Sequence, residues 1–360
     1  MKKVAINGFG RIGRAFLKLA FSSREINKDI DIITINDLGD LENFVYLLKY
    51  DSVYRQKVFK SIESKIINQD EKYLVIELAN GEKKEIRFIS EKDTNKFIEN
   101  KIWGNLGIDI VVECTGIFTS ADKSYFHIES GAKRVVLSAP TKDEKNSMRK
   151  AETVLMGINE NKLKDYFITS NASCTTNAAS PLMAILDEGI GIEKAILNTV
   201  HSYTASQSIV DGPNKKDWRE GRAGAQNIVP SNTGAAIALT KAFTKMEGLF
   251  DGIAIRVPSV AGSIVDITFI AKRNTNIEEV NRILENASHL DKWKNIFATT
   301  KEELVSTDIL ALRYASIADL KMTKVVDGNL VKVLAWYDNE IGYTQTLLDH
   351  VIKVSKYFKK

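Results

Sequence analysis

The hydrophobic positions in the first third of the chain form short runs that alternate with stretches of helical spacing. Val4–Ile6 is an apolar run that leads into a glycine-rich segment, and Ile12, Phe16 and Leu19 then recur at helical spacing. Buried parallel strands have a near-continuous apolar character. Further runs of this kind, each ending in turn residues, occupy residues 29–37, 108–116 and 132–140. Strands that alternate with helices predict a doubly wound α/β domain with a parallel sheet.

Two other patterns interrupt this alternation. Residues 43–51 have the spacing of a helix, and Tyr73, Val75 and Glu77 alternate with other residues before a turn at Asn80-Gly81. Period-two alternation followed by Asn-Gly predicts a β-hairpin.

The second half of the chain has longer strands with few helices between them. They are predicted in residues 193–203, 251–259, 263–273 and 330–340. Long strands in succession indicate an α+β domain with a mostly antiparallel or mixed sheet. We therefore expect an N-terminal domain over residues 1–173 and a catalytic domain over residues 174–339. A C-terminal helix over residues 340–360 should pack its apolar face back on the first domain.

Composition narrows the class of protein. The chain has 360 residues, of which 44% are hydrophobic and 27% are charged, as in ordinary globular proteins. Its net charge of +4 comes without clustered basic residues, so we expect no nucleic-acid partner. No apolar run approaches the roughly 20 residues that span a bilayer. The N-terminus enters structure at once and only two cysteines are present, so we expect no signal peptide and a cytoplasmic location.

The glycine-rich segment has the context of a dinucleotide site. Gly8, Gly10 and Gly13 follow a strand and open a helix, and Asp37 ends the next strand. In a Rossmann-type domain the first glycine makes a tight turn, the second admits a pyrophosphate and the third lets the helix approach the strand. A carboxylate at Asp37 would accept hydrogen bonds from ribose hydroxyls and repel a 2′-phosphate, which favours NAD over NADP. The alternative is a glycine turn without a ligand and an aspartate that caps a helix.

One cysteine lies in an unusual setting. Cys174 is surrounded by hydroxyl and amide side chains in the stretch SNASCTTNAAS, whereas a structural cysteine normally has apolar neighbours. A cysteine reacts as the thiolate and needs a base or a positive neighbour. Among the four histidines, His201 ends an apolar strand, where its side chain is rigidly held. A Cys174–His201 pair would form an activated nucleophile, while a purely structural histidine remains the alternative.

Hydroxyls and arginines in the second half suggest oxyanion binding. Arg256 lies on an otherwise apolar strand, where a buried arginine requires an anionic partner. Hydroxyls, backbone amides and guanidinium groups together suit phosphate oxygens. Surface charges and turn hydroxyls are the alternative for the other members of this set. The candidates are Ser173, Thr175, Thr204, Arg219, Thr233, Gly234 and Arg256.

The whole chain resembles the phosphorylating, NAD-dependent glyceraldehyde-3-phosphate dehydrogenases. The resemblance rests on the ordered motifs NGFGRIGR, SNASCTTN, HSYTASQ, DGPNKKDWREGRAGAQNIVPSNTGAA, IRVPS and WYDNEIGY. It implies oxidation of D-glyceraldehyde 3-phosphate to 1,3-bisphosphoglycerate with NAD and inorganic phosphate, through a cysteine thioester. It also implies a homotetramer in which the S-loop, Ser202–Arg222, lines the neighbouring subunit's cofactor site. Neither a metal nor a membrane is expected.

The resemblance implies a role for each matching residue. Cys174 is the nucleophile, His201 is the thiol activator and base, and Asn339 holds the carboxamide of the nicotinamide. The hydroxyl and arginine set above binds the substrate's phosphate and inorganic phosphate. The cofactor residues are Gly8, Gly10, Arg11, Ile12, Gly13, Asp37, Lys92, Thr115, Ser138 and Asn339.

The chain also departs from the family pattern. Ala178 stands where many members have a second cysteine, so no close thiol can resolve a sulfenic acid at Cys174. Lys92 stands where the family has an arginine. Three other functions are considered: erythrose-4-phosphate dehydrogenase, a non-catalytic NAD-binding protein and a nucleic-acid- or surface-binding module on this fold.

Overall fold

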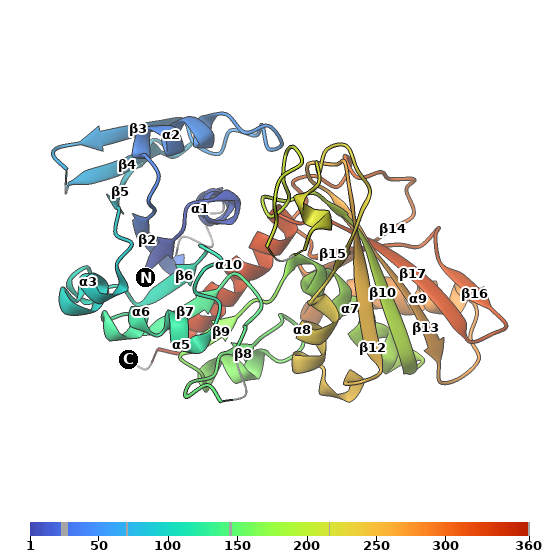
Figure 1. The fold of residues 1–360 in the computed structure, drawn as a ribbon. Helices are drawn as coiled ribbons and strands as arrows, with labels where there is room; N and C mark the ends of the chain where they lie inside the picture. Colours follow the sequence, from blue (N-terminus) through green and yellow to red (C-terminus); the bar gives the residue numbers. More distant parts are fainter. Residues whose placement is uncertain (23–27, 70, 144–145, 216, 359–360) are drawn as a thin grey trace. The chain divides into compact units, whose positions relative to one another are not determined.

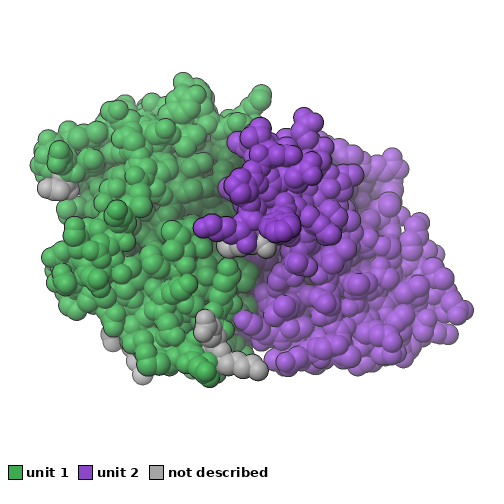
Figure 2. All heavy atoms as spheres, in the orientation of Figure 1, with its two compact units in different colours: residues 1–154, 161–171, 347–360 green, residues 155–160, 172–346 purple. Residues whose placement is uncertain are grey.

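The computed structural model describes residues 1–22, 28–69, 71–143, 146–215 and 217–358. Lys216 of the S-loop and the last two residues of the C-terminal segment lie outside these ranges. The chain forms two compact units, which Figure 2 distinguishes by colour. Unit 1 comprises residues 1–154, 161–171 and 347–360, and unit 2 comprises residues 155–160 and 172–346. The sequence places the boundaries at residues 173 and 339 and assigns residues 155–160 to the first domain.

Unit 1 is built on a nine-stranded sheet of order β3-β4-β5-β2-β1-β6-β7-β9-β8 (Figure 1). From β5 to β8 all neighbouring strands are parallel, which confirms the predicted doubly wound sheet. The predicted hairpin is confirmed as β4 and β5, and β3 extends it as a third antiparallel strand. The strands are β1 (Lys2–Asn7), β2 (Ile30–Asn36), β3 (Ser61–Ile66), β4 (Lys72–Glu77), β5 (Lys83–Ile89), β6 (Ile110–Glu113), β7 (Arg134–Leu137), β8 (Glu152–Thr153) and β9 (Ile168–Ser170).

The helices of unit 1 follow the parallel strands. The predicted helix after the glycine segment is confirmed as α1, and the one predicted in residues 43–51 as α2, whose first turn is capped by Asp40. Phe97 and Trp103, from α3 and α4, form a buried cluster with Ala5 and Val111 of the sheet. The helices are α1 (Arg11–Ser22), α2 (Leu41–Lys49), α3 (Thr94–Glu99), α4 (Ile102–Asn105), α5 (Ala121–Ser124), α6 (Phe126–Glu129) and the 3₁₀ helix η2 (Glu160–Lys164).

Polar side chains occupy the carboxyl edge of the unit 1 sheet. Asn36, Asn7 and Glu113 are the last residues of β2, β1 and β6, and the register places Asn7 beside both of the others. All three are buried. Ligands of doubly wound folds bind outside this edge, so the row lies where a cofactor would be expected.

Unit 2 contains an eight-stranded mixed sheet, as the sequence predicts. Its order is β11-β12-β10-β13-β17-β15-β14, with β16 paired to β17 (Figure 1). The β10–β12 pair is parallel and the β10–β13 and β13–β17 pairs are antiparallel. The strands are β10 (Ile192–Ser202), β11 (Val229–Asn232), β12 (Phe250–Val257), β13 (Ser263–Ala271), β14 (Phe297–Thr300), β15 (Ser316–Asp319), β16 (Lys324–Val326) and β17 (Leu330–Tyr337).

The long helix α7 packs against β10, β13, β15 and β17 of this sheet. Its apolar side chains, among them Leu182, Met183 and Leu186, are fully buried. The helices of unit 2 are α7 (Cys174–Gly189), α8 (Ala235–Ala242), α9 (Ile277–Ser288) and the 3₁₀ helices η3 (Arg219–Gly221), η4 (Thr244–Met246) and η5 (Asp291–Trp293).

The C-terminal helix α10 (Ile341–Lys356) places its residues from Leu347 onward in unit 1. Leu347, Val351 and Val354 are buried. His350 is fully buried as well, with Nε2 2.8 Å from Thr169 Oγ1 and Nδ1 3.2 Å from Asn171 Oδ1. These contacts tie the helix to the end of β9.

Candidate active site

Cys174 is the first residue of α7. Ser173 caps the helix, since its hydroxyl accepts a hydrogen bond from the backbone N–H of Thr176 at 3.2 Å. The thiol therefore lies at the positive end of a 16-residue helix. Burial raises the pKa of the thiol, and the backbone N–H groups of Cys174 and Thr175, which donate to the sulfur, offset only part of that rise. The sequence of small polar residues thus serves to begin a helix at the cysteine.

His201 and Arg256 reach this thiol from adjacent parallel strands. They are direct partners in the register of β10 and β12, so their side chains share one face of the sheet. His201 Nε2 lies 3.3 Å from Cys174 Sγ. On its other side, His201 Nδ1 lies 2.6 Å from the carbonyl oxygen of Ser202 and 2.5 Å from Arg256 Nη1. The structure therefore brings together a thiol, an imidazole and a guanidinium.

The charge state of this pair follows from burial. Removal from solvent raises the pKa of the Cys174 thiol, although the Arg256 guanidinium opposes that effect. Burial, assisted by the positive charge of Arg256, lowers the pKa of His201 to about 3. The Ser202 carbonyl can only accept and needs a proton on Nδ1, whereas Arg256 Nη1 can only donate and needs the same nitrogen unprotonated, so the two contacts compete for Nδ1. Burial of the thiol and of the imidazole favours a neutral thiol beside a neutral imidazole.

Arg256 is half-buried, and no carboxylate of the described residues forms an ion pair with it. The anionic partner that the sequence predicts for Arg256 is therefore not a side chain of the described residues, and a phosphate oxyanion stays the prediction. The Nε of Arg256 is buried and has no hydrogen-bond partner in the described part of the chain. A buried donor without a partner costs free energy unless a ligand satisfies it. The site therefore has an unmet requirement for an anion.

Two residues of the site were not identified from the sequence. The Tyr337 hydroxyl lies 2.9 Å from Thr175 Oγ1 and 2.8 Å from Thr199 Oγ1, and Thr199 donates to the carbonyl of Ile264 at 3.0 Å. Thr199 must then accept from Tyr337, which in turn accepts from Thr175. Tyr337 also packs edge-to-face on His201, with ring centroids 5.9 Å apart. Tyr337 belongs to the motif WYDNEIGY, which could have pointed to a role in the site, but the sequence analysis assigns a role only to Asn339 of that motif.

The remaining phosphate candidates occupy turns and helix ends of unit 2. Thr204 Oγ1 lies 3.0 Å from Ser206 Oγ, and Arg219 begins η3 with an exposed side chain. Thr233 accepts from the N–H of Ala235 at 3.2 Å, and Gly234 is the N-cap of α8. No hydrogen bond joins these four to Cys174 in the described ranges. The structure groups Thr175 and Arg256 with the cysteine and leaves these four outside that group.

Asn339 is buried in unit 2 with one end of its amide fixed. Its Oδ1 accepts from the N–H of Gly262 at 3.0 Å and from Ser263 Oγ at 3.2 Å. Since both partners are donors to the oxygen, the NH₂ group points away from them and remains able to donate to a ligand carbonyl.

In unit 1 a cavity of about 320 Å³ lies at the carboxyl edge of the sheet. Such volumes are typical of small-molecule sites. A Cβ at Gly10 would meet nothing within 4 Å, whereas one at Gly13 would lie 2.3 Å from the Gly8 carbonyl oxygen. These environments fit the two glycine roles, open approach and close helix packing. The lining includes the candidates Gly8, Gly10, Asp37, Lys92 and Thr115, together with Asn7, Asn36, Glu91 and Phe97.

The other cofactor candidates have mixed placements. Arg11 and Ile12 form the first turn of α1, but the Arg11 guanidinium lies 3.0 Å from Asp51 and stacks on Tyr54. Asp37 accepts from the N–H of Phe9 at 2.6 Å and of Gly39 at 2.9 Å. Ser138 follows β7 and does not line the cavity, although its N–H donates to the carbonyl of Glu113.

The described residues contain neither a metal-binding cluster nor a membrane-spanning helix. No group of three or more His, Cys, Asp or Glu side chains is arranged to hold a metal ion in the described ranges. Within the same ranges, every helix is too short or too polar to span a bilayer.

Comparison with known proteins identifies both halves of the chain. Residues 2–121 match the family model described as glyceraldehyde 3-phosphate dehydrogenase, NAD binding domain, and residues 173–339 match the model of the C-terminal domain. The glyceraldehyde-3-phosphate dehydrogenase of Buchnera aphidicola subsp. Schizaphis graminum is 42% identical over 349 residues, 97% of each chain. The cytosolic enzyme of Sinapis alba is 40% identical over 98% of each chain, and that of Geobacillus stearothermophilus is 40% identical over 96% of each. The chain therefore belongs to the glyceraldehyde-3-phosphate dehydrogenase family.

Proposed function

We propose that this protein oxidises D-glyceraldehyde 3-phosphate to 1,3-bisphosphoglycerate with NAD and inorganic phosphate, through a thioester on Cys174. The observation that carries the proposal is the 3.3 Å contact between Cys174 Sγ and His201 Nε2 at the N-terminus of α7. Names of relatives at about 40% identity over nearly the whole chain support the same substrate.

The first step joins the thiol to the aldehyde. His201 Nε2 accepts the thiol proton as sulfur attacks the carbonyl carbon, and the proton passes to the carbonyl oxygen to give a hemithioacetal. The backbone N–H of Cys174 and the imidazole stabilise the charge that develops on this oxygen. His201 then removes the hydroxyl proton while the carbon loses hydride, and a thioester remains on Cys174. Inorganic phosphate attacks the thioester carbonyl and releases the acyl phosphate and the thiol.

Arg256 is proposed to hold a phosphate oxyanion. Its unpartnered Nε and its contact with His201 support this role. The guanidinium lowers the pKa of His201, so an anion bound beside it would offset that charge and make the imidazole a stronger base. Ser173, Thr175, Thr204, Arg219, Thr233 and Gly234 are proposed to complete the two phosphate sites.

NAD, when bound, supplies the hydride acceptor. The unit 1 cavity and the open surroundings of Gly10 fit the adenosine and pyrophosphate portions, and Asp37 is proposed to accept from the ribose hydroxyls. Asn339 is proposed to donate its free NH₂ to the carboxamide and so fix which ring face receives hydride.

A homotetramer is proposed as the assembly. Ile209, Val210 and Trp218 of the S-loop are largely exposed, with Trp218 at 86%. Ile196 and Ile253 also expose their side chains on the neighbouring strands β10 and β12. Large exposed apolar patches favour burial against another chain. Light scattering during size-exclusion chromatography tests this, and a monomer would contradict it.

A cytoplasmic location is proposed as well. The relative from Sinapis alba has cytosolic in its name, and both Cys114 and Cys174 are free thiols. Free thiols persist in reducing compartments. Fractionation of cells that express the protein tests the location.

The activity is tested by following NADH formation from D-glyceraldehyde 3-phosphate. We expect turnover with NAD and phosphate, little with NADP, and loss of nearly all activity in Cys174→Ser with NAD binding retained. Iodoacetamide should label Cys174 before Cys114, because burial raises the pKa of the Cys114 thiol to about 12. Equal steady-state rates without phosphate, or preferred turnover of erythrose 4-phosphate, would contradict the proposal.

A further inference from the structure

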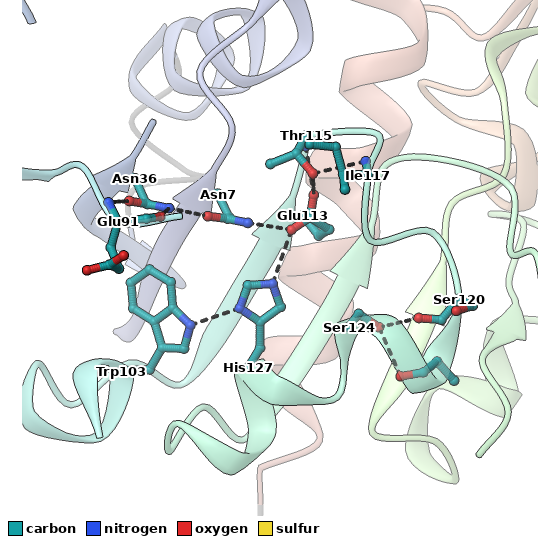
Figure 3. A network of polar contacts seen from close by, with 11 residues as sticks. Asn7, Asn36, Glu91, Trp103, Glu113, Thr115, Ile117, Ser120, Ser124 and His127 are labelled. Carbon is teal, nitrogen blue, oxygen red and sulfur yellow. Dashed lines mark hydrogen bonds and ion pairs between the residues drawn. The ribbon is translucent and has the colours of Figure 1, made fainter. Parts of the chain in front are cut away.

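A chain of buried polar contacts (Figure 3) includes residues that line the unit 1 cavity. The Glu113 side chain is 2% exposed and that of His127 is fully buried. Glu113 Oε2 lies 2.5 Å from Asn7 Nδ2 and 3.1 Å from His127 Nε2. Glu113 Oε1 accepts from the backbone N–H of Thr115 at 2.7 Å and from the Thr115 hydroxyl.

The chain connects two segments that both line the cavity. On one side Thr115 Oγ1 accepts from the N–H of Ile117 at 3.1 Å. On the other side Asn7 Oδ1 accepts from Asn36 Nδ2 at 2.7 Å, and Asn36 bonds both the N–H and the carbonyl of Glu91 at 2.9 and 3.0 Å. All of these residues except Glu113 line the cavity. Glu113 is thus the buried link between two segments, residues 91–93 and 115–117.

Three groups in this chain can donate a hydrogen bond but cannot accept one. They fix which partner donates in each hydrogen bond of the chain. The Trp103 indole only donates, at 2.9 Å to His127 Nδ1, so His127 is neutral and donates from Nε2 to Glu113. The N–H of Glu91 requires Asn36 Oδ1, which turns Asn36 Nδ2 toward Asn7. Asn7 must then donate to Glu113.

The third donor of this kind is the backbone N–H of Thr115, which points at Oε1. With the Thr115 hydroxyl, four donors converge on Glu113 and each oxygen receives two. A carboxylate can accept from four donors, two at each oxygen, so every acceptor position of Glu113 is used. An amide side chain could not accept from all four, because one of its two ends is itself a donor.

We propose that Glu113 is the positioning residue of the cofactor site, where its carboxylate holds the two walls of the cavity at the separation that the adenosine portion of NAD requires. This proposal rests on NAD binding in unit 1. It goes beyond the contacts that NAD itself makes, because Glu113 is not part of the cavity lining and acts through Thr115, Asn7 and Asn36, which are.

The substitution Glu113→Gln tests the carboxylate with almost no change of shape. If the new NH₂ group occupies the Oε1 position, it opposes the N–H of Thr115. If it occupies the Oε2 position, it faces the N–H donors of His127 and Asn7. Turning His127 over would bring an N–H against the Trp103 indole N–H, and turning Asn7 and Asn36 over would bring an NH₂ against the backbone N–H of Glu91. The first arrangement loses only one bond, so we expect the wall at Thr115 to loosen and NAD to bind more weakly by ~10-fold or more.

The measurement is NAD binding to the full-length protein without aldehyde, by titration calorimetry, followed by kcat and KM with each substrate. Ser124→Ala is the matched control, since Ser124 is buried in unit 1 and its hydroxyl donates to the carbonyls of Ser120 and Ala121, its side-chain partners among the described residues. We expect E113Q to raise Kd and KM for NAD while kcat at saturating NAD and KM for the aldehyde stay within about twofold. S124A should leave all of these unchanged.

Thr115→Val keeps the proposal testable if E113Q fails to fold. It removes the hydroxyl that links Glu113 to Ile117 and should raise the Kd for NAD severalfold. In E113Q with T115V the two losses should be less than additive, because both act on one contact. An unchanged Kd in either variant, additive losses, or a parallel fall of kcat and thermal stability with KM unchanged would overturn the proposal. Failure of the unmodified protein to bind NAD would instead refute the cofactor assignment.

Discussion

The buried His350 should make the protein lose stability as the pH falls below about 6.5. Burial, with a smaller effect of the nearby Lys353 charge, lowers the pKa of His350 from 6.5 to about 3. In the unfolded chain the same residue takes up a proton near pH 6.5. His350 therefore binds a proton more readily in the unfolded chain than in the folded protein. Its contribution to stability is present above pH 6.5 and is lost as the pH falls toward 3.

The magnitude follows from the two pKa values. Between pH 7.5 and pH 5.5 the unfolded state gains about 1.4 kcal/mol from protonation of one such histidine, while the folded state gains almost nothing. His350→Gln removes this effect and keeps side-chain groups for Thr169 and Asn171. We therefore expect the unmodified protein to lose about 1.4 kcal/mol more than the variant over this pH interval.

Urea unfolding at pH 7.5 and 5.5, at one protein concentration, measures the difference for both proteins. Contributions of all other titrating groups cancel in the comparison. Losses equal to within about 0.3 kcal/mol, or a larger loss in the variant, would show that His350 accepts its proton in the folded protein and would refute the reasoning.

Four further predictions concern the two sites. His201→Asn should lower turnover by about 10²–10⁴-fold, and the loss should persist at high pH, because turnover also needs removal of the hemithioacetal proton; full recovery at alkaline pH would leave His201 only as the thiol activator. Asp37→Gly with Pro213→Ser should raise kcat/KM with NADP by about tenfold or more, since a repelling carboxylate is lost and the S-loop gains a hydroxyl for a 2′-phosphate where Pro213 offers none. NADP use by the unmodified enzyme would contradict this. Gly13→Ala should cost about 1–3 kcal/mol of stability, because its Cβ would lie 2.3 Å from a backbone oxygen. Gly10→Ala, with open space around the Cβ, should fold normally and weaken NAD binding in a calorimetric titration.

Local patterns were sufficient for much of the fold and for the candidate nucleophile. The glycine segment lies between β1 and α1, the Asn80-Gly81 turn joins the antiparallel β4 and β5, and α7 begins at Cys174. In each case the residues that predict the turn or helix lie close in sequence to the turn or helix itself. His201 could be selected among the four histidines because it lies at the end of a predicted apolar strand.

Contacts between distant segments were beyond this kind of inference. The partnership of His201 with Arg256 depends on the register of β10 with β12, and that of Tyr337 with Thr175 depends on how α7 lies on the sheet. Arg256 illustrates the consequence, because the sequence indicates that it needs an anionic partner but does not reveal its contact with His201 or its buried Nε without a hydrogen-bond partner among the described residues.

The alternation of strands and helices, the glycine turn and the start of a helix at Cys174 follow from backbone preferences and capping among neighbours in the chain, so they can be predicted from the sequence. Which side chains share a face depends instead on how distant strands pair. The row Asn36–Asn7–Glu113 exists because three strands separated by up to 106 residues end side by side in a parallel sheet. A shift of one residue in a strand turns its side chains to the opposite face, so no local pattern can specify such a row.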